Sequence, residues 1–379
     1  MRRRNFPDQA CSRRISEAMP LEDVSVKTGA IHRTRHRRCL SLACLLLLLA
    51  ATMITTPARA SMTVLIGEPY GGFGTMLPVG HAAVYLDRVC ADTPLHLRMC
   101  RPGEPMGVVV SRYHHLRDLD WMASPVMEYL YAVERPDQVP QFATKESEAE
   151  LREQFRQTYL QLVIPNGTER EKQEDEWYET AGAAFDRRLW GYQVHTTVEQ
   201  DERFVAEMNS RVNHRRYHVI SANCANFVAD IVNMYYPKAV RPNRVADWGI
   251  VTPKHLARSM VALPKKHPEA RLRVLEIPQI PGTLRRSRPT WGISEFFLKT
   301  KRYSFTLAVI QPEAVIATLV LYESNGRFKL GTEAEKVEPQ FWIMDAEEIP
   351  GTEGTPAAVG SEGVNEFLVG TPDPDAPQN

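Results

Sequence analysis

The chain has 379 residues, of which 43% are hydrophobic and 24% are charged, so disordered, collagen-like and disulfide-framework proteins are excluded. Its 46 basic side chains equal its 46 acidic ones, but residues 1–60 hold 11 Lys and Arg against 4 Asp and Glu. The remaining residues therefore have seven more acidic than basic side chains. Because phosphate binding needs a clustered basic surface, nucleic acid is excluded as an expected partner.

Residues 1–60 are expected to form a secretory signal peptide with an extended basic first region. The basic stretch Ile31 to Arg38 precedes an apolar run, Cys39 to Ile54, and Ala58-Arg59-Ala60 offers a small-x-small cleavage site before Ser61. We therefore expect an exported protein of the periplasm or cell envelope. The alternative is an uncleaved membrane tether through Cys39 to Ile54, because this run approaches the ~20 residues that span a bilayer.

Three cysteines follow the leader: Cys90, Cys100 and Cys224. The residues between the first two can form a β-hairpin, which predicts a Cys90–Cys100 disulfide in an oxidising compartment and leaves Cys224 unpaired. A zinc site formed by Cys90, His96, Cys100 and a further histidine is the alternative. The short paired spacing of structural zinc sites is missing, so we expect no metal.

The residues from 61 to about 121 predict a small antiparallel sheet. Its expected strands are Met62 to Ile66, His81 to Leu86, Leu95 to Cys100 and Val108 to Tyr113. The glycine-rich segment between the first two strands lacks the Gly-Lys-Ser/Thr of a phosphate-binding loop and does not lead into a helix. Nucleotide binding is therefore not expected.

Residues from about 140 to 215 predict a helical insertion. A capping box of Ser147 and Glu150 marks the start of the first helix. Apolar residues at helical spacing indicate two helices, and a third is expected from Asp201 to His214. These apolar residues are Leu151, Phe155, Tyr159 and Leu162 in the first helix, and Trp177, Ala181, Phe185 and Leu189 in the second. We expect them to pack in the core, with this segment as an insertion or a lid over the site.

Cys224 is predicted to lie in the first turn of a helix that begins with Asn223-Cys224-Ala225-Asn226-Phe227, after a strand from Tyr217 to Ser221. Free backbone amides at a helix start favour the thiolate and lower a cysteine pKa from its usual value near ~8.5. The same amides can bind the oxyanion of a tetrahedral intermediate. Alternatively, Cys224 is a small buried hydrophobic residue.

A nucleophilic thiol needs a base, and the base needs a group that orients it. His81 begins one predicted strand, and His96 lies in a later extended segment. If both face the helix start, His81 accepts the proton of Cys224 and His96 fixes the tautomer of His81. Ser111, on the strand after His96, is a rival for this orienting role.

These segments resemble the circularly permuted papain-like thiol hydrolases, the group that contains lecithin:retinol acyltransferase-like proteins and permuted relatives of NlpC/P60 peptidases. The matching residues are His81-Ala82-Ala83-Val84-Tyr85-Leu86, His96-Leu97 and Asn223-Cys224-Ala225-Asn226-Phe227. The resemblance implies an α+β fold whose nucleophile helix packs on a small antiparallel sheet. It also implies that Cys224 attacks an amide, thioester or ester, with His81 as base and then acid, His96 as orienting group, and Asn223 and Tyr85 as supporting residues. The resemblance implies no organic cofactor. It makes a cell-wall peptide the first candidate substrate and a lipid acyl chain the second.

The chain departs from the family pattern in its long helical insertion, in the wide separation of His81 and His96, and in a long C-terminal extension. We expect the permuted papain-like domain over residues 61–265 and a small β module over 270–345. The module is predicted to contain strands Tyr303 to Ile310 and Ala314 to Tyr322, with a hairpin turn at Asn325-Gly326. The acidic tail 346–379 is expected to be disordered. The competing functions are a non-catalytic binding module of the cell envelope and a membrane-tethered structural module.

Overall fold

The computed structural model describes residues 61–71, 78–104, 107–114, 116–165, 177–243, 247–323 and 327–343. Two compact units divide the chain, Met1–Pro57 and Ala58–Asn379, and all described residues belong to the second. The predicted signal peptide, the Asn325-Gly326 turn and the predicted disordered tail lie outside the described residues. Within these ranges, no helix combines the length and the apolar composition needed to cross a bilayer.

The described unit is a mixed α+β fold built on a seven-stranded sheet, with strand order β6-β5-β2-β1-β7-β8-β9. Neighbouring strands are antiparallel except β8 and β9, which are parallel. The strands are β1 (Ser61–Gly67), β2 (His81–Leu86), β5 (Val108–Ser111), β6 (Met122–Pro125), β7 (Leu189–His195), β8 (Arg273–Ile277) and β9 (Glu335–Lys336). A separate two-stranded sheet contains β3 (Val89–Thr93) and β4 (His96–Met99). The α+β class and the predicted antiparallel strands are confirmed.

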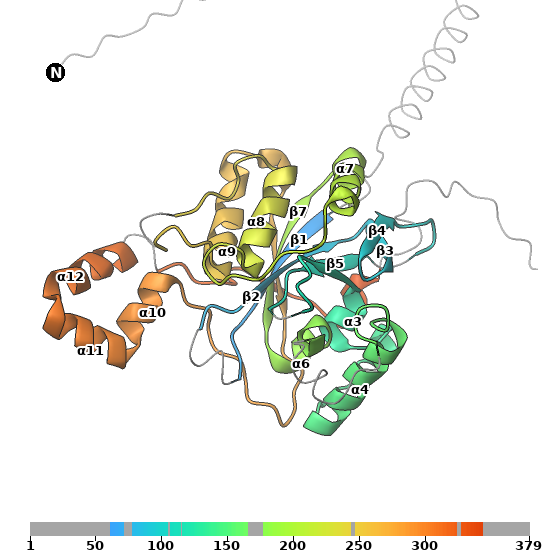
Figure 1. Cartoon of the computed structure of the whole chain (residues 1–379), viewed down its shortest axis with the longest axis horizontal. Helices are drawn as coiled ribbons and strands as arrows, with labels where there is room; N and C mark the ends of the chain where they lie inside the picture. Colours follow the sequence, from blue (N-terminus) through green and yellow to red (C-terminus); the bar gives the residue numbers. More distant parts are fainter. Residues whose placement is uncertain are drawn as a thin grey trace, which may run out of the picture. The chain divides into compact units, whose positions relative to one another are not determined.

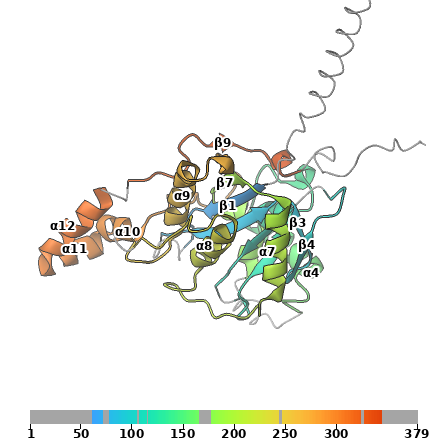
Figure 2. The ribbon, with the colours of Figure 1, turned by 90° about the horizontal axis from the view of Figure 1, so that it is seen from above.

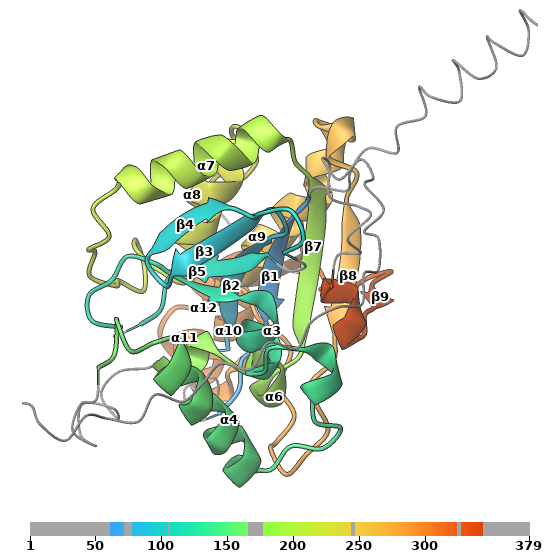
Figure 3. The same ribbon diagram turned by 90° about the vertical axis from the view of Figure 1, so that its right-hand side faces the viewer.

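Both faces of the large sheet are buried. Side chains of β1 alternate, so Met62, Val64 and Ile66 join one apolar cluster and Leu65 joins another. Helices α7 (Val198–Ser210), α8 (Cys224–Tyr235) and α9 (Pro253–Ala262) cover the first face (Figure 1). The other side of the sheet holds α3 (Val126–Tyr131), with α4 (Lys145–Thr158) and α6 (Ala183–Asp186) beside it (Figure 3).

The prediction that residues 140–215 form an insertion of three helices is wrong in its middle part. Helices α4 and α7 are present, with Thr144 rather than Ser147 as the N-cap of α4. The second predicted helix is replaced by a 3-10 helix, Trp177–Thr180, by the short helix α6 and by β7, which pairs with β1 in the centre of the sheet. Gly182 interrupts the helix because its φ is +69° and a Cβ there would lie 2.7 Å from the Phe185 ring. After it, the buried residues Trp190, Tyr192 and Val194 occupy every second position, which is the period of a strand.

The predicted β module at 270–345 is also only partly correct. Strands β8 and β9 come from this segment and extend the main sheet. The two strongest predicted strands are instead helices, α11 (Lys301–Ile310) and α12 (Pro312–Leu321), which follow α10 (Ile293–Lys299) (Figure 2). Short apolar runs do not distinguish strand from helix, and Pro312 occupies a first-turn position where proline favours a helix start.

The disulfide between Cys90 and Cys100 is present and closes a short loop that includes most of β3 and all of β4. Replacing both cysteines by serine should lower the free energy of unfolding by about 2–3 kcal/mol, because a loop of this length loses that much chain entropy when it is cross-linked. Urea denaturation of the double variant and of the reduced parent chain should give the same loss. Unchanged midpoints in both would contradict this assignment.

Candidate active site

Cys224 is the first residue of α8, and Asn223 caps that helix. The Asn223 Oδ1 accepts the backbone N–H of Asn226 at 2.8 Å, and its Nδ2 donates to the Val219 carbonyl at 2.7 Å. The Phe227 N–H donates to the Asn223 carbonyl at 3.2 Å. Asn223 therefore uses the amides of Asn226 and Phe227, whereas the backbone N–H of Cys224 faces the Tyr217 hydroxyl and that of Ala225 faces the Cys224 sulfur. An oxyanion at this helix start would replace these two partners. Asn223 thus supports the site as a cap.

The Cys224 thiol is buried and has three hydrogen-bonding neighbours. Burial raises its pKa, and this effect outweighs the lowering by the Ala82 amide, the Tyr217 hydroxyl and the Ala225 amide. The expectation of a lowered cysteine pKa is therefore wrong for this enclosed state. The helix amides are present as predicted, but desolvation of the charged form is the larger effect.

His81 begins β2 after a turn that requires glycine. Gly80 has φ +78°, and a Cβ there would lie 2.2 Å from the Gly67 carbonyl oxygen. This turn brings the chain into the pairing of Gly67 with His81, the last pair between β1 and β2. The imidazole is thereby fixed at the end of the central strands.

Ser111 is the partner of the His81 ring. The Ser111 Oγ lies 2.9 Å from His81 Nε2 and donates to the Ala82 carbonyl at 2.9 Å. A hydroxyl has one proton, so when that proton is donated to Ala82 the oxygen accepts from His81 Nε2–H. This arrangement leaves the lone pair on Nδ1, and Ser111 therefore fixes the tautomer in which Nδ1 is the base.

The backbone of Ala82 links the cysteine to the histidine. Its N–H is a hydrogen-bonding neighbour of the Cys224 sulfur, and its carbonyl accepts from Ser111 Oγ. The N–H and C=O of one strand residue point to the same neighbouring strand, so the sulfur and the Ser111–His81 pair lie on the same edge of β2. The structure thus links Cys224 to the Ser111–His81 pair through the backbone of Ala82.

His81 is neutral in this environment. Burial, and to a smaller extent the Arg187 guanidinium, lower its pKa from 6.5 to about 3. The Tyr113 ring stacks on the imidazole with centroids 5.4 Å apart. Arg187 lies 4.2 Å from the Tyr70 ring and pairs with Glu179 at 3.6 Å. Arg187 and Tyr113 were not predicted as site residues, because neither belongs to a recognisable motif.

Two predicted site residues lie elsewhere. His96 is on β4 of the small sheet, where its side chain is 59% exposed and its Nδ1 lies 3.7 Å from Asp92. It does not contact His81, and Ser111 occupies the orienting position. The Tyr85 ring packs edge-on against Trp342, at 5.2 Å, in a different apolar cluster from Cys224. Four strand residues after His81, Tyr85 is too far along β2 to support the oxyanion.

Arg112 holds the start of α8 against the sheet. This buried side chain pairs with Asp120, and its Nη1 donates to the Asn223 carbonyl at 3.4 Å. Its guanidinium carbon also lies 5.1 Å from the Phe227 ring centroid. A cation that bonds the cap residue and packs on the first turn fixes the position of Cys224.

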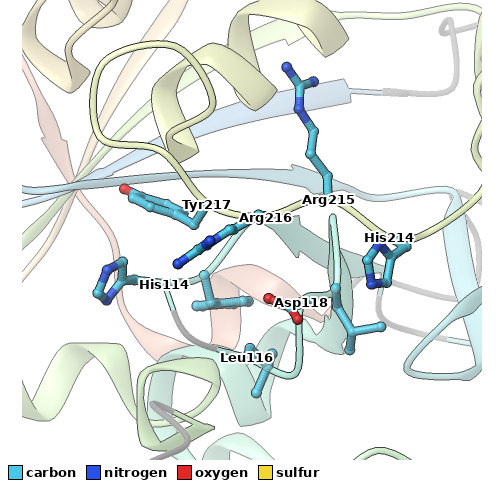
Figure 4. A pocket seen from close by; sticks show the side chains of 9 residues that line it. His114, Leu116, Asp118, His214, Arg215, Arg216 and Tyr217 are labelled. Atoms are coloured by element: carbon cyan, nitrogen blue, oxygen red, sulfur yellow. The ribbon is translucent and has the colours of Figure 1, made fainter.

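A cavity of about 330 Å³ lies next to these residues (Figure 4). Tyr217, a neighbour of the thiol, and Tyr113, which stacks on His81, form part of its wall. The predicted strand from Tyr217 to Ser221 is instead a turn closed by a bridge between His218 and Ala222. Tyr217 packs edge-on against His114 at 5.0 Å, and Figure 4 shows the Arg216 side chain beside these two rings.

The zinc alternative does not fit the described residues. Cys90, Cys100 and Glu104 place one potential ligand atom each within 4.8 Å of one another. The two sulfurs are bonded to each other, however, so neither is a thiolate that could bind zinc.

Comparisons with known proteins give little support for any family. No family model matches the chain, and no curated protein matches it. Among solved structures, the crystal structure of a type VI secretion system effector, TseH, is similar over 58% of this chain and 94% of its own, with 13% identity and a TM-score of 0.26. A TM-score this low does not establish a shared fold.

The neutral state of His81 predicts a pH dependence of stability. The folded-state pKa is below the unfolded value, so the stabilisation is present above pH 6.5 and is lost as the pH falls toward 3. Replacing His81 by Gln should remove a slope of up to about 1.4 kcal/mol per pH unit below pH 6.5. Urea denaturation between pH 4 and 7 measures this slope. Parallel profiles for parent and variant would contradict the buried, neutral imidazole.

Proposed function

We propose that the protein is an exported cysteine hydrolase with a permuted papain-like core, acting on an amide, thioester or ester. The observation that supports this proposal is the backbone of Ala82, which binds the Cys224 sulfur through its N–H and the Ser111–His81 pair through its carbonyl. A thiol at a helix start, a histidine and a group that orients the histidine form the constellation of nucleophilic catalysis.

The reaction uses each group in turn. The Cys224 thiol transfers its proton to His81 Nδ1 as sulfur bonds to the substrate carbonyl carbon, and the amides of Cys224 and Ala225 bind the oxyanion. The intermediate collapses when the bond to the leaving group breaks and His81 returns the proton to that group. Water, deprotonated by His81, then hydrolyses the thioester and releases Cys224. Ser111 keeps Nδ1 directed to the reaction through both steps.

The enclosed site holds a neutral thiol and a neutral imidazole. Desolvation raises the pKa of Cys224 and lowers that of His81, and both shifts oppose formation of the ion pair. Transfer of the proton is therefore easier after water or substrate enters. Tyr217 borders both the thiol and the cavity, so displacement of its hydroxyl from the sulfur is the step that admits the substrate carbonyl.

A non-catalytic envelope module is the second candidate, and the burial of the thiol favours it. Cys224 is only 5% exposed, and a buried cysteine with a raised pKa reacts slowly. The two candidates differ in one measurable property, because only a hydrolase needs the reactivity of Cys224 to depend on His81 and Ser111.

The cavity indicates the charge of the substrate. Arg215, Arg216, His114 and His214 line it together with one acidic residue, Asp118. Within the described residues the Arg216 guanidinium has no hydrogen bond or ion pair, whereas Arg215 points away from the cavity in Figure 4. An unpaired guanidinium in the wall of this cavity suits a carboxylate on the substrate. A cell-wall peptide amide next to an acidic residue is therefore the first candidate substrate.

Alkylation of Cys224 by iodoacetamide at neutral pH tests the catalytic constellation. His81→Ala should slow labelling by about 10²-fold or more, and Ser111→Ala by about tenfold, because general-base assistance is typically of this size. His96→Gln is the matched control, since this exposed histidine is not in the site, and should label like the parent. Labelling that is equally slow in all four proteins would support the non-catalytic module instead.

The charge preference is tested with two alkylating reagents of similar size. Arg216→Gln should slow labelling by the anion iodoacetate by about threefold or more, while labelling by neutral iodoacetamide stays unchanged, because the lost charge no longer attracts the anion. Arg211→Gln is the control, since Arg211 pairs with Glu207 and does not line the cavity. If Arg216→Gln slowed labelling by both reagents equally, Arg216 would not be the group that attracts an anionic substrate.

A further inference from the structure

The buried carboxylate of Asp87 lies beside Ser61, the first residue of β1, at the end of β2 that is opposite to His81. Asp87 follows β2, and its Oδ2 accepts the hydroxyl of Ser61 at 2.7 Å. The Gln193 side chain donates to the same hydroxyl oxygen at 3.0 Å. The backbone N–H of Ser61 also bonds the Asp87 carboxyl, while Asp87 Oδ1 is buried with no hydrogen-bond partner in the described structure.

The charges around Asp87 do not balance. Arg88 is the neighbouring cation, but it is already paired with Asp201 of α7 at 2.7 Å. Asp201 is further bonded by the Tyr235 hydroxyl of α8 at 3.0 Å, and His195 of β7 lies opposite Ser61 in the register. Two buried carboxyl groups therefore share one guanidinium. A second positive charge beside Ser61 would complete the cluster.

We propose that Asp87 is the receptor for a new amino terminus at Ser61, created when the peptide bond between Ala60 and Ser61 is hydrolysed. Ser61 is both the first residue of β1 and the residue that follows the small-x-small sequence Ala58-Arg59-Ala60. This inference rests on the proposed export of the chain and is independent of the proposed chemistry at Cys224.

The chemistry of the processing step is ordinary amide hydrolysis. An endopeptidase of the signal-peptidase type adds water across the bond, so that the C–N bond breaks and Ala60 keeps a carboxylate. The nitrogen of Ser61 leaves as an amine and takes a proton at neutral pH. It already faces the Asp87 carboxyl as an amide, so the ammonium forms a buried ion pair without a change of fold.

Processing should change the stability of the fold in a pH-dependent way. Before cleavage, burial raises the pKa of Asp87 to about 7, so its contribution to stability is full below pH 4 and is lost as the pH rises to 7. After cleavage, the Ser61 ammonium stabilises the charged Asp87 carboxylate, so stability is no longer lost as the pH rises to 7. The stability gained by cleavage therefore increases between pH 4 and 7.

The test uses the full chain with a site for a sequence-specific protease, one that cuts before serine, in place of residues 55–60. Tm is measured before and after cutting, between pH 4 and 8, for the parent, for Asp87→Asn and for the control Asp137→Asn. Asp137 is an exposed aspartate outside the cluster. We expect cutting to raise Tm near pH 7 by several degrees in the parent and in Asp137→Asn, but not in Asp87→Asn.

A second measurement does not require the Asp87 variant to fold. In the cut parent, acetylation of the Ser61 amine by acetic anhydride should be about tenfold slower than in a peptide with the same first residues, because an ion-paired ammonium is a poor nucleophile. A Tm gain that is the same in Asp87→Asn, or a Ser61 amine as reactive as that of the peptide, would overturn the proposal. Slow labelling of Cys224 would not affect it.

Discussion

The candidate active site depends on the backbone of one strand residue, Ala82. Ala82 has a methyl side chain that performs no chemistry, yet its N–H meets the Cys224 sulfur and its carbonyl fixes Ser111, which in turn binds His81. Backbone groups at the end of a strand are set by the register of the whole sheet. The distance between nucleophile and base therefore depends on the pairing of β1 with β2, and on the position of α8 against them.

The same enclosure that fixes this geometry also opposes ionisation. Desolvation acts in opposite directions on a thiol and an imidazole, raising the pKa of Cys224 and lowering that of His81, so both effects favour the uncharged pair. Arg187 adds to this by placing a buried positive charge near the imidazole. The resting site consequently holds the thiol rather than the thiolate, so reaction at sulfur requires a base that accepts its proton.

Local sequence signals predicted the elements that depend on local physics. The segment Asn223-Cys224-Ala225-Asn226-Phe227 placed Cys224 at a helix start, and short apolar, β-branched runs predicted β1, β2 and β5. The strand character of β7 and the burial of the site depend on distant partners and were not predictable. The apolar runs that form α11 and α12 fit a strand as well as a helix. Ser111 remained only a rival to His96 because no sequence spacing shows that β5 rather than β4 lies beside β2. The raised pKa of Cys224 is invisible in sequence for the same reason.

The central position of β1 has a consequence for how the molecule folds. β1 pairs on one side with its near neighbour β2, but on the other with β7, which is more than 100 residues later in the chain. Such a non-local pairing requires the closure of a long loop, which costs chain entropy before any strand contact stabilises it. Slow folding with exposed strand edges is therefore expected. A chain that pairs its central strand late leaves the edge of β1 open for longer, so pairing between chains is the expected side reaction of refolding at high concentration.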